Sequence, residues 1–334
     1  NRKKMSTNNI NQNLTNLASP KIGTKIIEVS DDFFGEASRM LDDKEPVFIE
    51  DKYDEHGKWM DGWESKRRRD GGNDWAIIEL GSPGIITEID IDTSFFTGNF
   101  PPFASIEGLY SDQKPSKDSD WIEILSKTSL KGDSGNKFKI ESKTKVNYIK
   151  LQIFPDGGVA RLRLFGEVKL NWENYDNKND LIELSSLKLG GSIVAYNNAH
   201  YGDVSALLSH GRGKTMGDGW ETRRRREPGN DWIIIKLATK GLIKKIEIDT
   251  AHFKGNYPDQ ASVQVSNFDK NKGLEEVIND SHNWKYILDK SKLQADNIHN
   301  YEVNDTSIKG VTHVRLNIYP DGGVSRLRIF GLKL

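Results

Sequence analysis

Two arginine-rich segments follow the same acidic and aromatic residues at two places in the chain. The segment 61–74 reads DGWESKRRRDGGND, and the segment 218–231 reads DGWETRRRREPGND. A guanidinium group binds a carboxylate through two parallel hydrogen bonds, so Arg67 and Arg224 are candidates for binding a small anion. The glutamates of these segments are candidates for proton transfer. The alternative is a solvated loop anchored by its tryptophan, with the arginines paired to neighbouring acids.

A second repeated segment places carboxylate and amide groups directly after a strand-like stretch. DTSFFTGNFP at 92–101 returns as DTAHFKGNYP at 249–258. Functional groups often gather where a strand opens into a loop, so the aspartate and the asparagine of both copies are candidate site residues. Turn formation by Asp and Asn around a glycine explains the asparagines equally well.

Histidines break the match between the two copies. His252 stands where the first copy has Phe95, and His200 stands where it has Phe33. Imidazole titrates near neutral pH, so a proton-transfer role for these residues would belong to the second copy alone. His56 is the weaker candidate in the first copy. The alternative is a purely structural histidine, which is the more common case.

A third repeated segment combines a turn with a strand that carries two arginines. PDGGVARLRLFG occupies 155–166, and PDGGVSRLRIFG occupies 320–331. Turn formation alone explains the Pro-Asp-Gly-Gly part. Successive side chains of a strand point to opposite faces, so the arginines share one face and the leucines the other. The arginines bind an anion if their face borders a pocket, and are merely solvated if it faces water.

The sequence contains no recognised metal or nucleotide motif. The chain has no cysteine, which excludes cysteine nucleophiles and thiolate metal sites. None of its seven histidines shows the close spacing of a zinc site. GxSxG, P-loop and GxGxxG sequences are also absent. We therefore expect no cofactor, and a divalent metal held by separate loops stays open as an alternative.

The segments that carry these groups are predicted to be β-strands. Apolar and polar residues alternate in 86–93 and in 311–319, which is the period of a half-buried strand. Gly and Pro at short intervals favour antiparallel strands in a β-sandwich or jelly roll. Short helical turns are expected at 36–41 and 204–208.

The matched segments divide the chain into two copies of one unit. The predicted fold is all-β, a tandem duplication of a jelly-roll β-sandwich. We expect a disordered polar tail at 1–15, a first repeat at 16–170, a polar linker at 171–180 and a second repeat at 181–334. The spacing between matched segments changes along the chain, so loop lengths differ between the copies.

Charge and hydropathy limit the classes of partner. Lys and Arg total 48 against 49 Asp and Glu, a net charge of -1. A neutral chain has no general attraction for nucleic acid or acidic membranes, and no apolar run approaches the ~20 residues of a membrane span. We expect neither partner, and a cytoplasmic location. Leu332-Lys333-Leu334 is similar to a peroxisomal signal but lacks its small first residue, so the peroxisome is the minor alternative.

The combined order of motifs resembles known families. DWxIIxLG, ITxIxID, VxxIxLxIxPDGG and RLRLFG follow one another as in the discoidin or galactose-binding jelly roll. More closely, DGWE-[ST]-[KR]-RR, DWxII, DTxxFxGNxP and PDGGxxR[LI]R, each present twice, look like the allantoicase family from about Ile22 to Gly331. This resemblance implies hydrolysis of allantoate to ureidoglycolate and urea in purine (allantoin) degradation. It also implies a homo-oligomer.

Allantoate carries one carboxylate and two ureido groups on a single carbon. The implied chemistry therefore needs a cation, amide partners, a general acid and a general base. From this chemistry and the motif positions, the candidate catalytic residues are Asp249, His252, Glu221 and His200, with Asp92, Glu64 and His56 as weaker first-repeat counterparts. The candidate substrate-binding residues are Arg224, Arg326, Arg328, Asn256, Arg67, Arg161, Arg163 and Asn99.

The main alternative function is a non-enzymatic, discoidin-like module that binds a small polar or carbohydrate ligand. Such modules usually carry exposed aromatic or apolar residues on the loops at one end. The matched loop residues of this chain are Asp, Glu and Arg instead. They suit a small polar anion better, so the sequence favours the enzyme.

Overall fold

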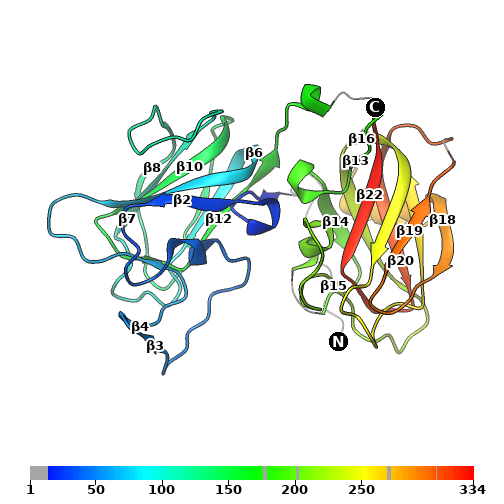
Figure 1. The fold of residues 1–334 in the computed structure, drawn as a ribbon, viewed down its shortest axis with the longest axis horizontal. Helices are drawn as coiled ribbons and strands as arrows, with labels where there is room; N and C mark the ends of the chain where they lie inside the picture. Colours follow the sequence, from blue (N-terminus) through cyan, green and yellow to red (C-terminus); the bar gives the residue numbers. More distant parts are fainter. Residues whose placement is uncertain (1–13, 176–178, 201–202, 269–271, 306) are drawn as a thin grey trace. The chain divides into compact units, whose positions relative to one another are not determined.

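The computed structural model describes residues 14–175, 179–200, 203–268, 272–305 and 307–334 (Figure 1). The described chain forms two compact units, Thr15–Leu170 and Asn171–Leu334. Residues 1–13 of the predicted tail lie outside the described residues, and Thr15 already belongs to the first strand. Residues 176–178 of the predicted linker also lie outside them, and Trp172–Tyr175 forms the 3-10 helix η4.

The first unit consists of strands and two 3-10 helices. The predicted helical turn at 36–41 is confirmed as η3, and β3–β4 is a hairpin in the loop that follows it. The elements in chain order are β1 Thr15–Asn16, η2 Pro20–Ile22, β2 Lys25–Val29, η3 Ala37–Leu41, β3 Tyr53–Asp54, β4 Gly57–Lys58, β5 Trp63–Glu64, β6 Asp74–Asp92, β7 Phe103–Leu109, β8 Ile122–Ser129, β9 Lys137–Lys139, β10 Lys145–Phe154, β11 Gly158–Val159 and β12 Arg161–Val168.

The second unit repeats this order, without the β3–β4 hairpin and with one added α-helix. The predicted turn at 204–208 is confirmed as η6. After η4 the elements are β13 Ile182–Glu183, η5 Leu187–Leu189, β14 Ser192–Tyr196, η6 Val204–Leu208, β15 Trp220–Glu221, β16 Asp231–Asp249, β17 Gln260–Ser266, α1 Leu274–Ser281, β18 Lys285–Lys292, β19 Ile298–Glu302, β20 Val311–Tyr319, β21 Gly323–Val324 and β22 Arg326–Lys333.

One long strand joins the two layers of each unit. The first half of β6 pairs with β2 and β10, and its second half pairs with β9 and β12. In the second unit β16 does the same with β14 and β20, then with β19 and β22. All these pairs are antiparallel, so the predicted all-β tandem duplication is confirmed.

The strand cores follow the predicted alternation with one correction. Ile89 and Ile91 are fully buried opposite Leu164 and Leu162 of β12, as a period of two requires. A strict period of two counted from Ile89 would place Ile86 on the opposite face, but this side chain is buried as well. The pairing register shifts at this point because Thr87 is an extra residue, a β-bulge that returns Ile86 to the core side.

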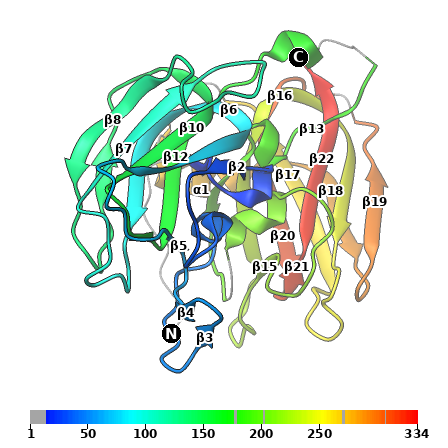
Figure 2. The same ribbon diagram turned by 60° about the vertical axis from the view of Figure 1, so that its left-hand side comes forward.

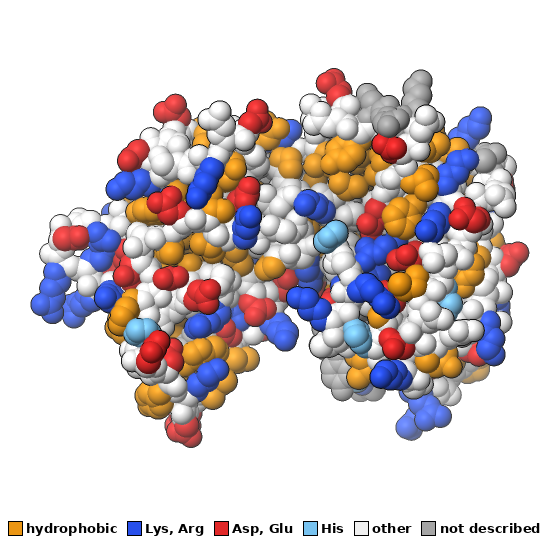
Figure 3. Space-filling model, in the orientation of Figure 1, with side chains coloured by type: hydrophobic (Ala, Val, Ile, Leu, Met, Phe, Trp, Pro, Cys, Tyr) orange, Lys and Arg blue, Asp and Glu red, His pale blue; other side chains and the backbone are white. Residues whose placement is uncertain are grey.

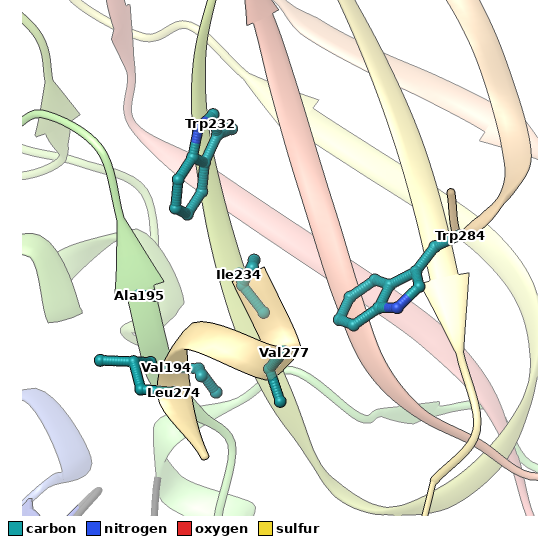
Figure 4. Close-up of a cluster of buried hydrophobic side chains, with 7 residues drawn as sticks. All are labelled: Val194, Ala195, Trp232, Ile234, Leu274, Val277 and Trp284. Atoms are coloured by element: carbon teal, nitrogen blue, oxygen red, sulfur yellow. The ribbon is translucent and has the colours of Figure 1, made fainter. Parts of the chain in front are cut away.

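Helix α1 was not predicted from the sequence. Its apolar residues Leu274 and Val277 are buried in a cluster with Trp232 and Ile234 of β16 and with Trp284, which directly precedes β18 (Figure 4). Their spacing of three residues puts them on one face of a helix. The helix has only two turns and a mostly polar sequence, so its signal is weak outside this packing. Within the described residues no helix has the length and apolarity to cross a membrane.

Candidate functional site

The first and third repeated motifs meet at one end of each sandwich. Trp63–Glu64 pairs with Gly158–Val159, and the second unit repeats this with β15 and β21, which lie side by side in Figure 2. The two tryptophans are fully buried and donate their indole N–H to backbone carbonyls at 2.8 and 2.9 Å. A buried anchor thus fixes the glutamate that follows each tryptophan.

Glycine is required beside this small ladder. A Cβ placed on Gly158 would lie 2.0 Å from the ring of Phe96, and one on Gly323 would lie 2.0 Å from the ring of Phe253. Gly157 has φ +135, a conformation that favours glycine. The Asp-Gly-Gly sequence is therefore explained by close packing under the site.

The second motif supplies a partner for each glutamate. Asn99 donates from Nδ2 to Oε2 of Glu64 at 3.0 Å, and Asn256 donates from Nδ2 to Oε1 of Glu221 at 2.5 Å. The backbone carbonyl of Asn99 accepts the N–H of Gly158 at 2.8 Å, and that of Asn256 accepts the N–H of Gly323 at the same distance. Three segments distant in sequence therefore converge on one carboxylate in each repeat.

Burial changes the acidity of the first-repeat carboxyl. It raises the pKa of Glu64 from 4.5 to about 6, because desolvation disfavours the charged form more than the Asn99 hydrogen bond favours it. A group with this pKa exchanges protons near neutral pH. Glu64 is thus a chemically reasonable acid, although the sequence ranked it below its second-repeat counterpart.

The surroundings of the two glutamates differ at the positions where histidine breaks the repeat. In the second repeat, Nε of Arg223 donates to Nδ1 of His200 at 2.9 Å, so this histidine carries its ring proton on Nε2 when neutral. The backbone N–H of His200 also donates to the carbonyl of Glu221 at 2.7 Å. In the first repeat, Nζ of Lys66 lies 4.0 Å from the centre of the Phe33 ring.

His56 belongs to the apolar side of the first-repeat site. Its ring centre lies 4.0 Å from that of Phe33, and its Nε2 lies 3.4 Å from the carboxylate of Glu55. No contact between His56 and Glu64 is found in the part of the chain that the structure describes. The structure therefore gives His56 an aromatic contact, whereas His200 contacts the residues around Glu221.

The arginines of the first motif alternate between structural and exposed positions. Nη1 of Arg68 binds the fully buried Asp74 at 2.8 Å, and Arg225 binds Asp231 at the same distance. Arg67 and Arg224 precede them and are exposed. Neither makes a hydrogen bond or ion pair within the described ranges, so both remain available to an anion.

The arginines of the third motif are held inside each repeat. Arg161 is 1% exposed and binds Asp61 through two nitrogens at 2.7 and 3.2 Å, and Arg326 is equally buried and binds Asp218 at 2.9 Å. Arg328 binds Glu183 and Glu247 at 2.9 and 3.1 Å. From the sequence, these side chains were expected to face either a pocket or bulk water. The structure instead covers them with the loop that precedes the Asp-Gly-Trp-Glu motif.

Arg163 completes this set and contacts the same loop. Its guanidinium group donates to the backbone carbonyls of Asp42, Asp43 and Lys44. A buried guanidinium group needs carboxylate or carbonyl partners to offset its desolvation. The positions of these four arginines are consistent with that structural requirement.

The predicted residues Asp249 and His252 lie at the start of one loop in the second repeat. Asp249 is 1% exposed, and its Oδ1 accepts the N–H of Ala251 at 2.8 Å. Nε2 of His252 lies 2.6 Å from the carbonyl oxygen of Gly213, so Nε2 carries a proton. Its Nδ1 contacts no polar atom of the residues that the structure describes, which leaves that nitrogen able to accept a proton.

The first-repeat equivalents lack this arrangement. Oδ1 of Asp92 accepts from the backbone N–H and the hydroxyl of Ser94 at 2.8 and 2.6 Å. The ring of Phe95 stacks on Phe48 with centres 5.8 Å apart. Phe95 and His252 share the left-handed backbone conformation, with φ 72 and φ 70. The backbone is therefore conserved between the repeats while the imidazole occurs only in the second.

The described residues show neither a cluster of metal ligands nor a concentration of one charge on the visible face. Within them, no group of three or more His, Asp or Glu side chains is arranged to hold a metal ion. Acidic and basic side chains are interspersed over the visible face in Figure 3, in keeping with the balanced composition.

Comparison with known proteins places these features in a family. The model of the allantoicase repeat matches residues 15–169 and, a second time, residues 182–334. This chain belongs to the allantoicase family. It is 48% identical over 317 residues to a protein named probable allantoicase 1 from Burkholderia mallei, covering 95% of this chain and 94% of that one. It is 46% identical over 318 residues to a probable allantoicase from Acinetobacter baylyi, with the same two coverages.

A solved allantoicase has the same fold. The crystal structure of the Saccharomyces cerevisiae allantoicase matches with a TM-score of 0.81 and 35% identity, covering 96% of this chain and 93% of that one. The chain therefore contains the repeat of this family twice. The resemblance inferred from the motifs is confirmed.

Proposed function

We propose that this allantoicase-family chain hydrolyses allantoate to ureidoglycolate and urea, a step of allantoin and purine degradation. The observation that carries the proposal is the glutamate–asparagine pair, with an exposed arginine that follows the glutamate closely in the chain, which occurs in both repeats. Its donors and acceptors match a substrate with one carboxylate and two ureido groups. The names of the relatives support the same activity.

The reaction breaks the bond between the central carbon and one ureido nitrogen. The leaving nitrogen takes up a proton to become urea, and the oxygen of water ends on the carbon as a hydroxyl group. A general acid and a general base suffice for these two proton transfers. The amide groups of Asn99 and Asn256 can bind ureido groups, and Arg67 and Arg224 can attract the carboxylate.

We place the reaction centre in the second repeat. His252 has a protonated Nε2 fixed on a carbonyl and an Nδ1 free of described partners, which suits a general base. Glu221 is the proposed proton donor to the leaving nitrogen, and His200 lies at the same site, where its backbone N–H donates to the Glu221 carbonyl and its ring accepts from Arg223. We assign Arg161, Arg163, Arg326 and Arg328 to holding the loops, because their guanidinium groups are engaged there.

A non-enzymatic binding module is less favoured, because the matched loop groups are charged. The proposal requires no metal, and metal dependence is one outcome of the assay below. We further propose a cytoplasmic enzyme that forms a homo-oligomer, with the peroxisome as the alternative location. These last points rest on the sequence alone.

The proposal is tested by incubating the purified chain with allantoate and measuring urea and ureidoglycolate. We expect both products in equal amounts, with EDTA and with added divalent metal as parallel conditions. Absence of urea under every condition would contradict the proposal. In the same assay His252→Ala should abolish turnover while Asp92→Ala retains it, and equal losses would sink the assignment to the second repeat.

A further inference from the structure

The loop before the Asp-Gly-Trp-Glu motif is fixed on the sandwich in the same way in both repeats. In the second repeat, Arg326 and Arg328 both donate to the carbonyl of Gly211, at 3.0 and 2.5 Å. In the first repeat, Arg161 and Arg163 both donate to the carbonyl of Lys44, at 2.8 and 3.2 Å. Gly211 and Lys44 are therefore structurally equivalent, although the loops differ in length.

This equivalence identifies a charge difference that sequence matching did not show. The residue after Gly211 is Arg212, and the residue after Lys44 is Glu45. Both are exposed. The same point of the fold thus carries a cation in the second repeat and an anion in the first.

Arg212 is oriented by a buried carboxylate. Its Nε lies 3.5 Å from Oδ2 of Asp249, a residue that is 1% exposed, while the Arg212 side chain is 60% exposed. Its two terminal nitrogens contact no polar atom within the described ranges. They form a planar pair of donors, the arrangement that binds a carboxylate through two hydrogen bonds.

The residues around Arg212 hold this arrangement in place. His252 contacts the carbonyl of Gly213 at 2.6 Å, which fixes the loop on the other side of Arg212. The pKa of Asp296 is lowered, chiefly by the backbone N–H of His252 and also by the charges of Lys254, His252 and Arg212. The charge of Arg212 therefore lies close to the loop that carries the proposed base.

We infer that Arg212, rather than the candidate Arg224, binds the substrate carboxylate in the second repeat and that Asp249 orients its guanidinium group. This inference rests on the proposed function and deepens it. The buried Asp249 is then a positioning residue rather than a proton carrier. In the first repeat Glu45 repels a carboxylate, and Asp92 has Ser94 as its partner instead of a guanidinium group.

Steady-state kinetics with allantoate test the inference. Arg212→Gln should raise KM roughly ten- to hundredfold with kcat changed by less than about threefold, because the carboxylate is bound alike in ground and transition states. Lys214→Gln removes the same charge from an exposed residue of the same loop, and Glu45→Gln alters the equivalent first-repeat position. Both controls should keep KM within about twofold. An unchanged KM in Arg212→Gln, or an equal rise in Lys214→Gln, would overturn the inference.

A second arm separates a binding role from a folding role. Guanidinium ion should restore part of the affinity to Arg212→Gly, and Asp249→Asn should prevent this rescue. Calorimetry should show that wild type binds allantoate more tightly than methylenediurea, which lacks the carboxylate, and that Arg212→Gln loses this preference. If wild type releases no urea, the proposed function fails. A carboxylate preference that depends on Arg212 would still support the subsite, and a preference retained by Arg212→Gln would overturn it.

Discussion

Single carboxylates in this protein have different tasks according to their burial and their partners. Glu64 is held by one amide hydrogen bond, and burial raises its pKa to about 6. Asp61 is also buried, but its two oxygens bind the guanidinium group of Arg161. The first residue is suited to exchanging a proton, and the second is suited to holding a charge in place.

Glu64→Gln should change stability in a pH-dependent manner. The folded state binds the Glu64 proton more tightly than the unfolded state, so its contribution is fully present below pH 4.5 and is lost as the pH rises to about 6. Glutamine removes this loss and keeps an acceptor for Asn99. We expect the variant to be more stable than wild type by up to about 2 kcal/mol at pH 8 and indistinguishable at pH 4.5. Urea denaturation at both pH values measures this, and an equal change at the two values would count against it.

Asp61→Ala should destabilise the first unit strongly. The substitution leaves the Arg161 guanidinium buried without its carboxylate, a situation that costs roughly 3–5 kcal/mol. Asp70→Ala is the matched control, because it removes an exposed carboxylate from Arg68 and leaves the Asp74 partner intact. Thermal unfolding of both variants decides the question. Similar losses of stability in Asp61→Ala and Asp70→Ala would show that burial does not determine how much an arginine–aspartate pair stabilises the protein.

At the scale of the elements, two-residue ladders carry the site. The ladder of β5 and β11 requires glycine at position 158, since the ring of Phe96 occupies the space where a side chain would lie. The long strand β6 ends at Asp92, whose carbonyl accepts the N–H of Ala160 right after β11, and β16 ends at Asp249, whose carbonyl accepts the N–H of Ser325 right after β21 in the second repeat. Close packing therefore brings together the glutamate of the first motif and the aspartate of the second motif, which are far apart in the sequence.

Gly158→Ala should distort this ladder. The added methyl group would lie 2.0 Å from the Phe96 ring, so the strand or the ring must move. We expect a loss of roughly 1–3 kcal/mol in unfolding free energy. Gly98→Ala serves as the control, since nothing lies within 4 Å of its added Cβ. Chemical denaturation measures the unfolding free energy of both variants. Equal stabilities of Gly158→Ala and Gly98→Ala would contradict the packing argument.

The sequence predicted the elements well because its signals are local and repeated. Matched glycines, alternating isoleucines and the two helical turns each indicate structure within a few residues. The bulge at Thr87 and helix α1 were missed, since both depend on packing against distant strands. The burial of Arg161 and Arg326 was missed for the same reason. Arg212 was not among the residues predicted from the sequence, because its loop differs in length from the first-repeat loop and no repeated motif aligns Arg212 with Glu45.

At the scale of the whole chain, the duplication has preserved the framework and diversified the chemistry. Each unit has its own two-layer core and its own glutamate–asparagine pair. Histidine replaces phenylalanine twice in the second repeat, and Arg212 replaces Glu45. These changes add two imidazole groups and a cation to one unit only. We therefore expect the two sites to be unequal in activity.

The paired substitutions Glu221→Gln and Glu64→Gln test this central claim most directly, because they alter the same position of the two repeats. The quantity to measure is kcat for urea release from allantoate. Loss of the proton donor should lower kcat by roughly 100-fold or more in Glu221→Gln. Glu64→Gln should stay within about threefold of wild type. An equal loss in the two variants, or a loss confined to Glu64→Gln, would contradict the assignment of the reaction to the second repeat.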